Sequence, residues 1–77
     1  MKELIEYIAN QLVNDPSQVD VSEVEESRRV RVELKVAKND MGRVIGKGGR
    51  IANSMRVLLR VAAAREGKRA SLEIVEP

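Results

Sequence analysis

Apolar and polar residues follow different spacings along the chain, and each spacing predicts one kind of element. Residues 2–13 place their apolar side chains at helical spacing, which predicts an amphipathic helix that ends before Pro16. Residues 29–36 alternate without error between apolar and polar, the pattern of a half-buried strand. Residues 70–75 alternate in the same way and predict a closing strand.

The segment before the strand at 29–36 is less regular. Val19, Val21 and Val24 predict a first strand, and the slip in their spacing after Val21 suggests a bulge or a ragged end. The polar residues 25–28 that follow are typical of a turn. The two strands are close enough along the chain to pair as a hairpin.

Two helices separated by glycines are predicted in the second half of the chain. Asn39 or Asp40 is suited to cap a short helix that runs up to the glycine-rich segment 46–49. Apolar spacing then predicts a longer helix over residues 50–66. The residues of this helix expected to face the core are Ile51, Met55, Leu58, Leu59 and Ala62.

The order of elements is therefore α-β-β-α-α-β, within a single domain that spans residues 1–77. A chain of this length has room for only one small domain. A three-stranded sheet with one apolar face, covered on that face by three helices, satisfies all of these patterns. The predicted fold class is α+β.

Composition limits the chemistry that is available to the chain. It has no Cys and no His, and Tyr7 is its only aromatic residue. Disulfides and thiolate metal sites are thus excluded, and the commonest general base is missing. We therefore expect no catalytic residue, no metal site and no cofactor, and an enzyme is the weakest interpretation. A membrane span needs about 20 consecutive apolar residues, and no apolar run in this chain comes near that length. The N-terminus has no signal-peptide pattern. We therefore expect a cytoplasmic protein without membrane association.

The net charge of +2 is unevenly distributed. Residues 1–37 contain five basic and eight acidic residues, and residues 70–77 contain two acidic ones. Residues 38–69 contain nine basic and two acidic residues, a net charge of +7. A segment with this positive charge is expected in a protein that binds a polyanion. Because Arg and Lys also solvate ordinary helix faces, charge alone leaves both interpretations open.

Three glycines in four residues, Gly46-Lys47-Gly48-Gly49, separate the two helices of this basic segment. A plain turn usually needs only one, since each Gly inside a helix costs roughly 0.5–1 kcal/mol relative to Ala. A loop with few side chains at a helix N-terminus exposes unpaired N–H groups and the positive end of the helix dipole. Lys47 adds a full positive charge. We therefore favour a phosphate-binding loop over a plain turn.

Two nucleotide-binding motifs do not fit this loop. A P-loop has four residues between its first Gly and its Gly-Lys pair, followed by Ser or Thr. Here Gly42 and Gly46 are one residue too close, and Gly48 takes the hydroxyl position. A dinucleotide-binding fingerprint requires Gly where this chain has Ile51.

The segment 44–49, VIGKGG, resembles the V-I-G-x-x-G signature of KH domains, and Gly42 fits the glycine often found before it. The α-β-β-α-α-β order is that of type II KH domains. Across nearly the whole chain the sequence resembles the KhpA family of small bacterial single-KH-domain proteins. The resemblance implies binding of single-stranded RNA, with the loop gripping the backbone of about four nucleotides. One departure is Ala52, where KH domains often have Ile, with Ile51 beside it.

The resemblance also implies which residues contact RNA. The loop would hold the sugar-phosphate backbone, and residues before and after it would line or flank a groove for the bases. The residues implied are Gly42, Arg43, Ile45, Gly46, Lys47, Gly48, Gly49, Arg50, Asn53 and Ser54. For Ile45 and Ile51, core packing is an equal alternative. For Arg56 and Arg60, one helical turn apart, a solvated stripe is favoured.

The function implied by the resemblance is that of a low-specificity RNA-binding or RNA-chaperone protein linked to cell shape and cell-wall growth. The implied protein partners are a second copy, as a homodimer, or a larger Jag-type KH-containing protein, as a heterodimer. One alternative is therefore a protein–protein assembly subunit. Another is a helix-turn-helix DNA binder over residues 40–66. The turn is too rich in glycine for this, and Ile51, Met55 and Leu58 are expected to face the core where a recognition helix needs polar side chains.

Overall fold

The central strand of a three-stranded sheet organises the fold. The computed structural model describes residues 1–76, and the predicted order α-β-β-α-α-β is confirmed. The helices and strands are α1 (Lys2–Leu12), β1 (Asp20–Glu26), β2 (Arg29–Lys35), α2 (Met41–Ile45), α3 (Arg50–Arg65) and β3 (Arg69–Val75). Three short 3₁₀ turns connect them: η1 (Pro16–Gln18), η2 (Lys38–Asp40) and η3 (Lys47–Gly49).

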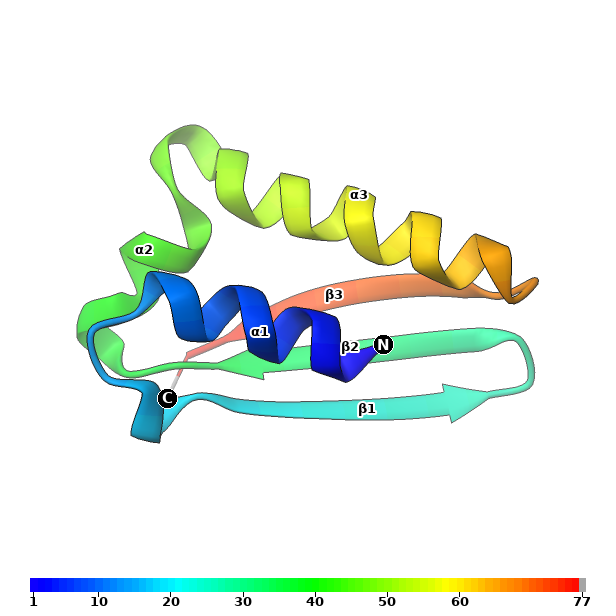
Figure 1. The fold of residues 1–77 in the computed structure, drawn as a ribbon, viewed down its shortest axis with the longest axis horizontal. Helices are drawn as coiled ribbons and strands as arrows, with labels where there is room; N and C mark the ends of the chain where they lie inside the picture. The colour runs from blue at the N-terminus through cyan, green and yellow to red at the C-terminus, as the bar shows by residue number, and fades with distance from the viewer. Residues whose placement is uncertain (77) are drawn as a thin grey trace.

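The sheet is mixed, with β2 between the other two strands. β1 and β2 run antiparallel, whereas β2 and β3 run parallel. The helices lie on one side of the sheet, with α2 at one end of the helical layer (Figure 1). The predicted α+β arrangement is therefore confirmed. Alternation along β2 puts every second side chain under the helices. The largest buried apolar side chains are Ile5, Val30, Val32, Leu34, Val36, Val44, Met55 and Leu59.

α3 turns a slightly different face to the sheet from the one predicted. Met55 and Leu59 are buried as expected, but Leu58 is 49% exposed, so its prediction as a core residue is wrong. Ala52 and Ala63 are buried instead. They share a face with Met55 and Leu59 because residues three and four apart lie on the same side of a helix.

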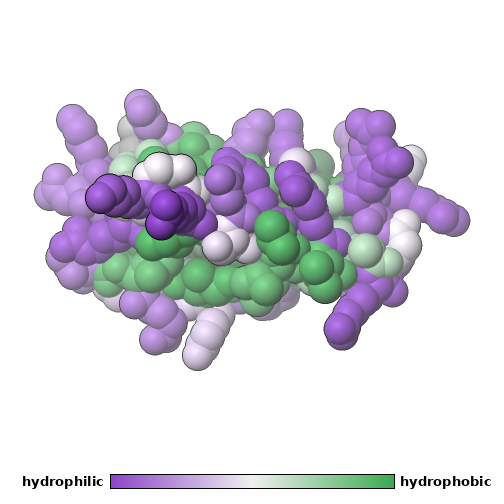
Figure 2. Space-filling view, turned by 90° about the horizontal axis from the view of Figure 1, so that it is seen from above, coloured by the Kyte–Doolittle hydropathy of each residue, from purple (hydrophilic) through white to green (hydrophobic). Residues whose placement is uncertain are grey.

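An apolar strip remains on the outer side of α3. Val57 is 54% exposed and Val61 is 51% exposed, and half-exposed Leu58 lies beside them. We call these three residues the α3 stripe. Seen from above, hydrophobic surface forms a band along the molecule between hydrophilic side chains (Figure 2). No element of the described residues covers this part of α3.

The first strand contains no bulge. Its pairing with β2 is continuous over all seven residues of β1, so of the two explanations for the slip in spacing, a bulge or a ragged end, the bulge is wrong. Val21 is buried on the helix side of the sheet, while Val24 lies on the opposite side and is 47% exposed. β1 also extends through Glu26, which shortens the predicted turn to Ser27 and Arg28.

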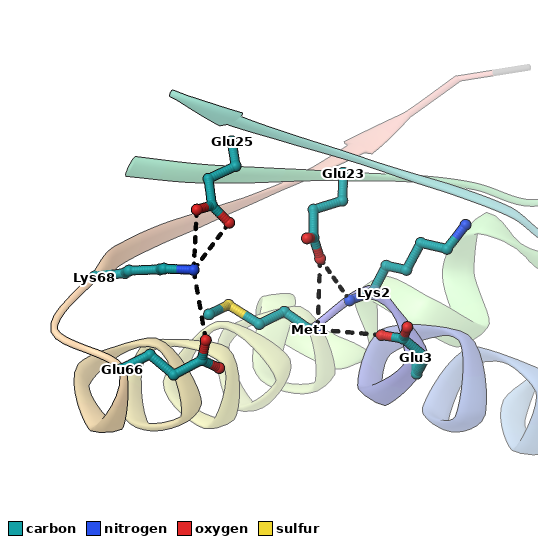
Figure 3. A network of polar contacts seen from close by, with 7 residues as sticks. All are labelled: Met1, Lys2, Glu3, Glu23, Glu25, Glu66 and Lys68. Atoms are coloured by element: carbon teal, nitrogen blue, oxygen red, sulfur yellow. Dashed lines mark hydrogen bonds and ion pairs between the residues drawn. The ribbon is translucent and has the colours of Figure 1, made fainter. Parts of the chain in front are cut away.

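Glutamates take the inward positions that follow the buried valine of β1. Glu25 accepts a hydrogen bond from Lys68 Nζ (3.0 Å), and this bond raises the pKa of Lys68. Glu66 lies 3.5 Å from the same ammonium group, and Glu23 lies 3.5 Å from the amino group of Met1. These contacts attach the turn after α3 and the start of α1 to β1 (Figure 3).

A buried carboxylate connects the end of α1 to the start of α2. Asp40 is only 2% exposed. Its Oδ1 and Oδ2 accept hydrogen bonds from the backbone N–H groups of Asn14 (3.0 Å) and Asp15 (3.1 Å). Arg43 Nη1 lies 3.5 Å from the same carboxylate. Asp40 occupies the N-cap position of α2, as predicted, but its side chain makes no capping bond to that helix.

Replacing Asp40 by Ala is expected to destabilise the domain by about 2–4 kcal/mol. The substitution leaves two backbone N–H groups without their acceptor and removes the partner of Arg43. Urea denaturation measures the change in the free energy of unfolding. Asp20→Ala, at an exposed acid of β1, is the control and should change stability by less than about 0.5 kcal/mol. A similar small effect of both substitutions would contradict this role of Asp40.

Candidate nucleic-acid interface

Three glycines with positive φ form the turn between α2 and α3. Gly46 has φ 77° and ψ 171°, a region that is nearly restricted to glycine. Gly48 (φ 64°) and Gly49 (φ 77°) lie in the left-handed region, which disfavours residues with a side chain. Backbone geometry therefore explains why three of the four loop residues are glycines.

Gly46 also has no room for a side chain. A Cβ atom at this position would lie 2.6 Å from Cγ1 of Ile51. Ile51 is partly buried and packs against the core, so the first turn of α3 closes directly on the loop. Ile45, in contrast, is 36% exposed. Of the two open interpretations for these isoleucines, core packing describes Ile51. The exposure of Ile45 excludes core packing for it and leaves contact with the base groove as a prediction.

The loop presents free hydrogen-bond donors to solvent. The N–H of Gly49 donates to the carbonyl of Gly46 (3.1 Å), and that of Arg50 donates to the carbonyl of Lys47. Among residues 1–76, the N–H groups of Lys47 and Gly48 have no hydrogen-bond acceptor, and both residues are exposed. They lie at the N-terminus of α3, where the helix dipole places partial positive charge. This arrangement suits a phosphate group.

The predicted site residues before the loop differ in their freedom to contact a ligand. Gly42 is exposed, and a Cβ atom there would meet no neighbour within 4 Å. Arg43 Nη1 donates to the carbonyl of Asn39 (3.3 Å) and also lies near the Asp40 carboxylate. Its guanidinium is thus held against η2. Ile45 offers an exposed apolar side chain next to the loop.

The predicted residues after the loop also differ. Ser54 Oγ donates to the carbonyl of Arg50 (2.9 Å), so this hydroxyl is engaged within α3. The amide of Asn53 lies beside the loop, because a Cβ atom on Gly49 would be 3.9 Å from its Nδ2. The side chains of Arg50 and Asn53 are exposed. The structure therefore brings Asn53 to the loop but not the hydroxyl of Ser54.

Arg56 extends this surface, although charge spacing favours a solvated stripe for it. Its Nη1 donates to Oδ1 of Asn53 (3.0 Å), and its Nε donates to the carbonyl of Leu72 in β3 (3.3 Å). The guanidinium thus joins α3 to an edge strand of the sheet. The three-residue spacing of Asn53 and Arg56 indicates a shared helix face. The contact with Leu72, 16 residues away, leaves no such signal in the sequence.

Comparison with known proteins assigns the family. A family model described as KhpA/KhpB, KH domain, matches residues 2–74. The chain belongs to the KhpA/KhpB KH-domain family. It is 51% identical to "RNA-binding protein KhpA" of Clostridium acetobutylicum. The match extends over 75 residues and covers 97% of this chain and all of that relative. A protein of the same name from Chlamydia trachomatis is 43% identical over 76 residues, which covers 99% of this chain and 97% of that relative. The one from Aquifex aeolicus is 41% identical over 76 residues, which covers 99% of this chain and 96% of that relative.

Membership of the KhpA/KhpB family confirms the resemblance and favours a KH domain over a helix-turn-helix unit. Leu58 faces outward rather than into the core, so Ile51 and Met55 are the residues of α3 whose inward position still counts against a recognition helix. In residues 1–76 no group of acidic side chains could hold a metal ion. Over the same residues, no helix is long and apolar enough to cross a bilayer.

Two glycine substitutions should separate steric from conformational requirements in the loop. Gly46→Ala is expected to destabilise the domain by about 3 kcal/mol, because it combines a disfavoured backbone conformation with a clash against Ile51. Gly48→Ala should cost only about 1 kcal/mol, since its Cβ position is open. Thermal or urea unfolding measures both values. Equal losses for the two variants would contradict the packing of Gly46 on Ile51.

Proposed function

We propose that this chain binds single-stranded RNA through the loop 46–49 and catalyses no reaction. The observation that supports this most directly is the pair of unbonded amides at Lys47 and Gly48, next to an ammonium group and a helix N-terminus. Relatives named RNA-binding protein, at up to 51% identity, add support.

The proposed contact is with the sugar-phosphate backbone. The free amides donate to phosphate oxygens, and the ammonium group of Lys47 adds charge. Gly48 has no side chain to keep the phosphate away, and the space around it is open. Asn53 and Arg56 then line the path of the bases between α3 and β3, and Ile45 supplies an apolar contact. The RNA therefore runs along α3 from its N-terminal end.

Binding of this kind is weak and depends on salt. RNA-binding modules that stack bases on aromatic rings gain about 1–3 kcal/mol per base. This chain has Tyr7 as its single aromatic residue, so phosphate contacts supply most of the affinity. Such contacts weaken steadily as salt is added, and we expect a Kd on the order of micromolar at physiological salt.

Three predictions drawn from the family resemblance stay predictions. They are an RNA-chaperone activity, a link to cell shape and cell-wall growth, and a cytoplasmic location. Weak binding with little base preference is compatible with a chaperone, because such a protein must release the strands that it binds.

Replacing both Lys47 and Gly48 by Asp tests the loop. The new carboxylates repel phosphate, and Asp tolerates the left-handed backbone of Gly48 better than most residues do. We expect affinity for an RNA of about five nucleotides to fall by at least about tenfold, while the melting temperature changes little. Fluorescence anisotropy measures the affinity, and circular dichroism follows the melting.

The matched control is the double variant Lys35→Asp and Gly67→Asp. It has the same change in charge, and Gly67 also has a positive φ (69°) with open space at its Cβ position. Both control positions lie outside the loop, so this variant should bind the short RNA nearly as tightly as the wild type does. Unchanged affinity of the loop variant, or equal weakening of both variants, would contradict the proposal.

A second proposed function is self-association through the α3 stripe. Its residues lie in the middle of α3, so a two-fold axis across the helix would place the stripes of two copies against each other. A helix face about 24 Å long and 10 Å wide covers less than the roughly 800 Å² per partner of a typical stable interface. The homodimer is therefore weak. A heterodimer with a Jag-type KH-containing protein stays the alternative implied by the resemblance.

Val61→Asp is expected to shift the chain from dimer to monomer without unfolding it, because Val61 is exposed in the single copy. Sedimentation velocity at several concentrations measures the association constant, which should fall at least about tenfold. Val24→Asp, on the helix-free side of the sheet, makes the same chemical change and should leave association unaltered. Wild-type chain that is monomeric at about millimolar concentration would contradict self-association.

A further inference from the structure

A cleft on the helix-free side of the sheet is lined by arginines. Its volume is about 480 Å³, and it adjoins a second hollow of about 640 Å³ at the β1–β2 hairpin. Glu26, Arg29 and Arg69 line both of these hollows, Arg31 lines the first and Arg28 lines the second. We call the four arginines and the space between them the arginine cleft.

The arginines of this cleft repel one another. Arg29 and Arg69 are direct partners in the register of β2 and β3, so they stand on the same face about 4.8 Å apart at the backbone. Like charges in directly opposite positions destabilise a sheet, and Glu26, which lies opposite Arg29 on β1, offsets part of this repulsion. Within residues 1–76, Arg28, Arg29 and Arg69 form no ion pair, while Arg31 pairs with Glu33 at 3.5 Å. A bound anion would reduce this repulsion.

The arginine cleft lies about one helix length from the loop 46–49. α3 begins at that loop, and its 16 residues extend about 24 Å. The turn after α3 then lies against the β1–β2 hairpin, where the N–H of Arg69 donates to the carbonyl of Arg28 (2.8 Å). Figure 1 shows this hairpin at the end of the molecule opposite α2. Arg56 and Arg60, four residues apart on α3, lie between the two regions and continue the positive charge.

We propose that the arginine cleft is a second phosphate-binding surface for the same RNA strand. The inference rests on the proposed function, because the loop 46–49 would hold one part of the strand. Nucleotides that pass the end of α3 reach the edge strand β3 and turn around it at Arg69. Their phosphates then lie on Arg29 and Arg31 on the helix-free side. Guanidinium groups bind phosphate in a two-pronged geometry, which favours a phosphodiester chain as the occupant.

RNA length is the variable that tests this surface. An oligouridine of about five nucleotides occupies little more than the loop site. One of about twelve nucleotides spans roughly 40 Å even when stacked at 3.4 Å per nucleotide. That length exceeds the 35 Å longest extent of the protein. The longer RNA can therefore contact both surfaces, and the shorter one cannot.

The double variant Arg29→Ser and Arg69→Ser should weaken binding of the longer RNA about tenfold and leave binding of the shorter RNA within about twofold. The slope of log Kd against log salt for the longer RNA should fall by about 1.4, the value for two lost phosphate contacts on a single strand. Lys2→Ser combined with Lys35→Ser is the control, since it removes two exposed positive charges elsewhere. Its affinity for the longer RNA should fall less than about twofold.

Three results would overturn the inference. The wild type could bind both lengths equally, the arginine variant could bind the longer RNA no more weakly than the lysine control, or it could lose the shorter RNA as well. In each case, loss of both RNAs by the loop variant Lys47→Asp and Gly48→Asp keeps the proposed function intact. Retention of both RNAs by that loop variant would instead overturn the proposed function itself. The melting temperature of the arginine variant should stay close to that of the wild type, because the substitution removes the repulsion between Arg29 and Arg69 together with the attraction between Arg29 and Glu26.

Discussion

The buried carboxylate of Asp40 is the contact on which the position of the loop depends. A charged group removed from water requires partners, and here two backbone N–H groups and one guanidinium supply them. These contacts tie the segment after α1 to the start of α2, and α2 leads within five residues into the loop. A domain of this size has a small core. One buried polar attachment therefore has a large share in orienting the helical layer.

The loop has a packed side and an open side. Gly46 fits against Ile51, which fixes the loop to the first turn of α3. Lys47 and Gly48 lie on the open side with unbonded amides. A ligand that binds these amides meets a backbone already held in place, so little conformational freedom is lost on binding. The rigid backbone of the loop and its free N–H groups thus come from neighbouring residues of one short segment.

Sequence patterns predict those parts of the fold that depend on local spacing. The alternation in β2 and the glycines of the loop belong to this class, and both are confirmed in place. The inward glutamates of β1 do not, because their partners Lys68 and Met1 come from distant segments. The same reason applies to Arg56, whose acceptor lies in β3, and to Asp40, whose donors lie 25 and 26 residues earlier. For the site residues, the sequence therefore predicts where each one lies along the backbone, but it does not predict which hydrogen bonds or ion pairs its side chain forms.

The parallel pairing of β2 with β3 has a consequence for the order of folding. Arg29 pairs with Arg69, and the entire loop region lies in the 39 residues between these two positions. Pairings so far apart in the chain close late, because the entropy of the intervening segment opposes them. α3 packs chiefly on β3, so this helix gains its main contact with the sheet only when the late pairing has formed. The orientation of α3, and with it the direction in which the free amides of the loop 46–49 point, is therefore fixed late in folding.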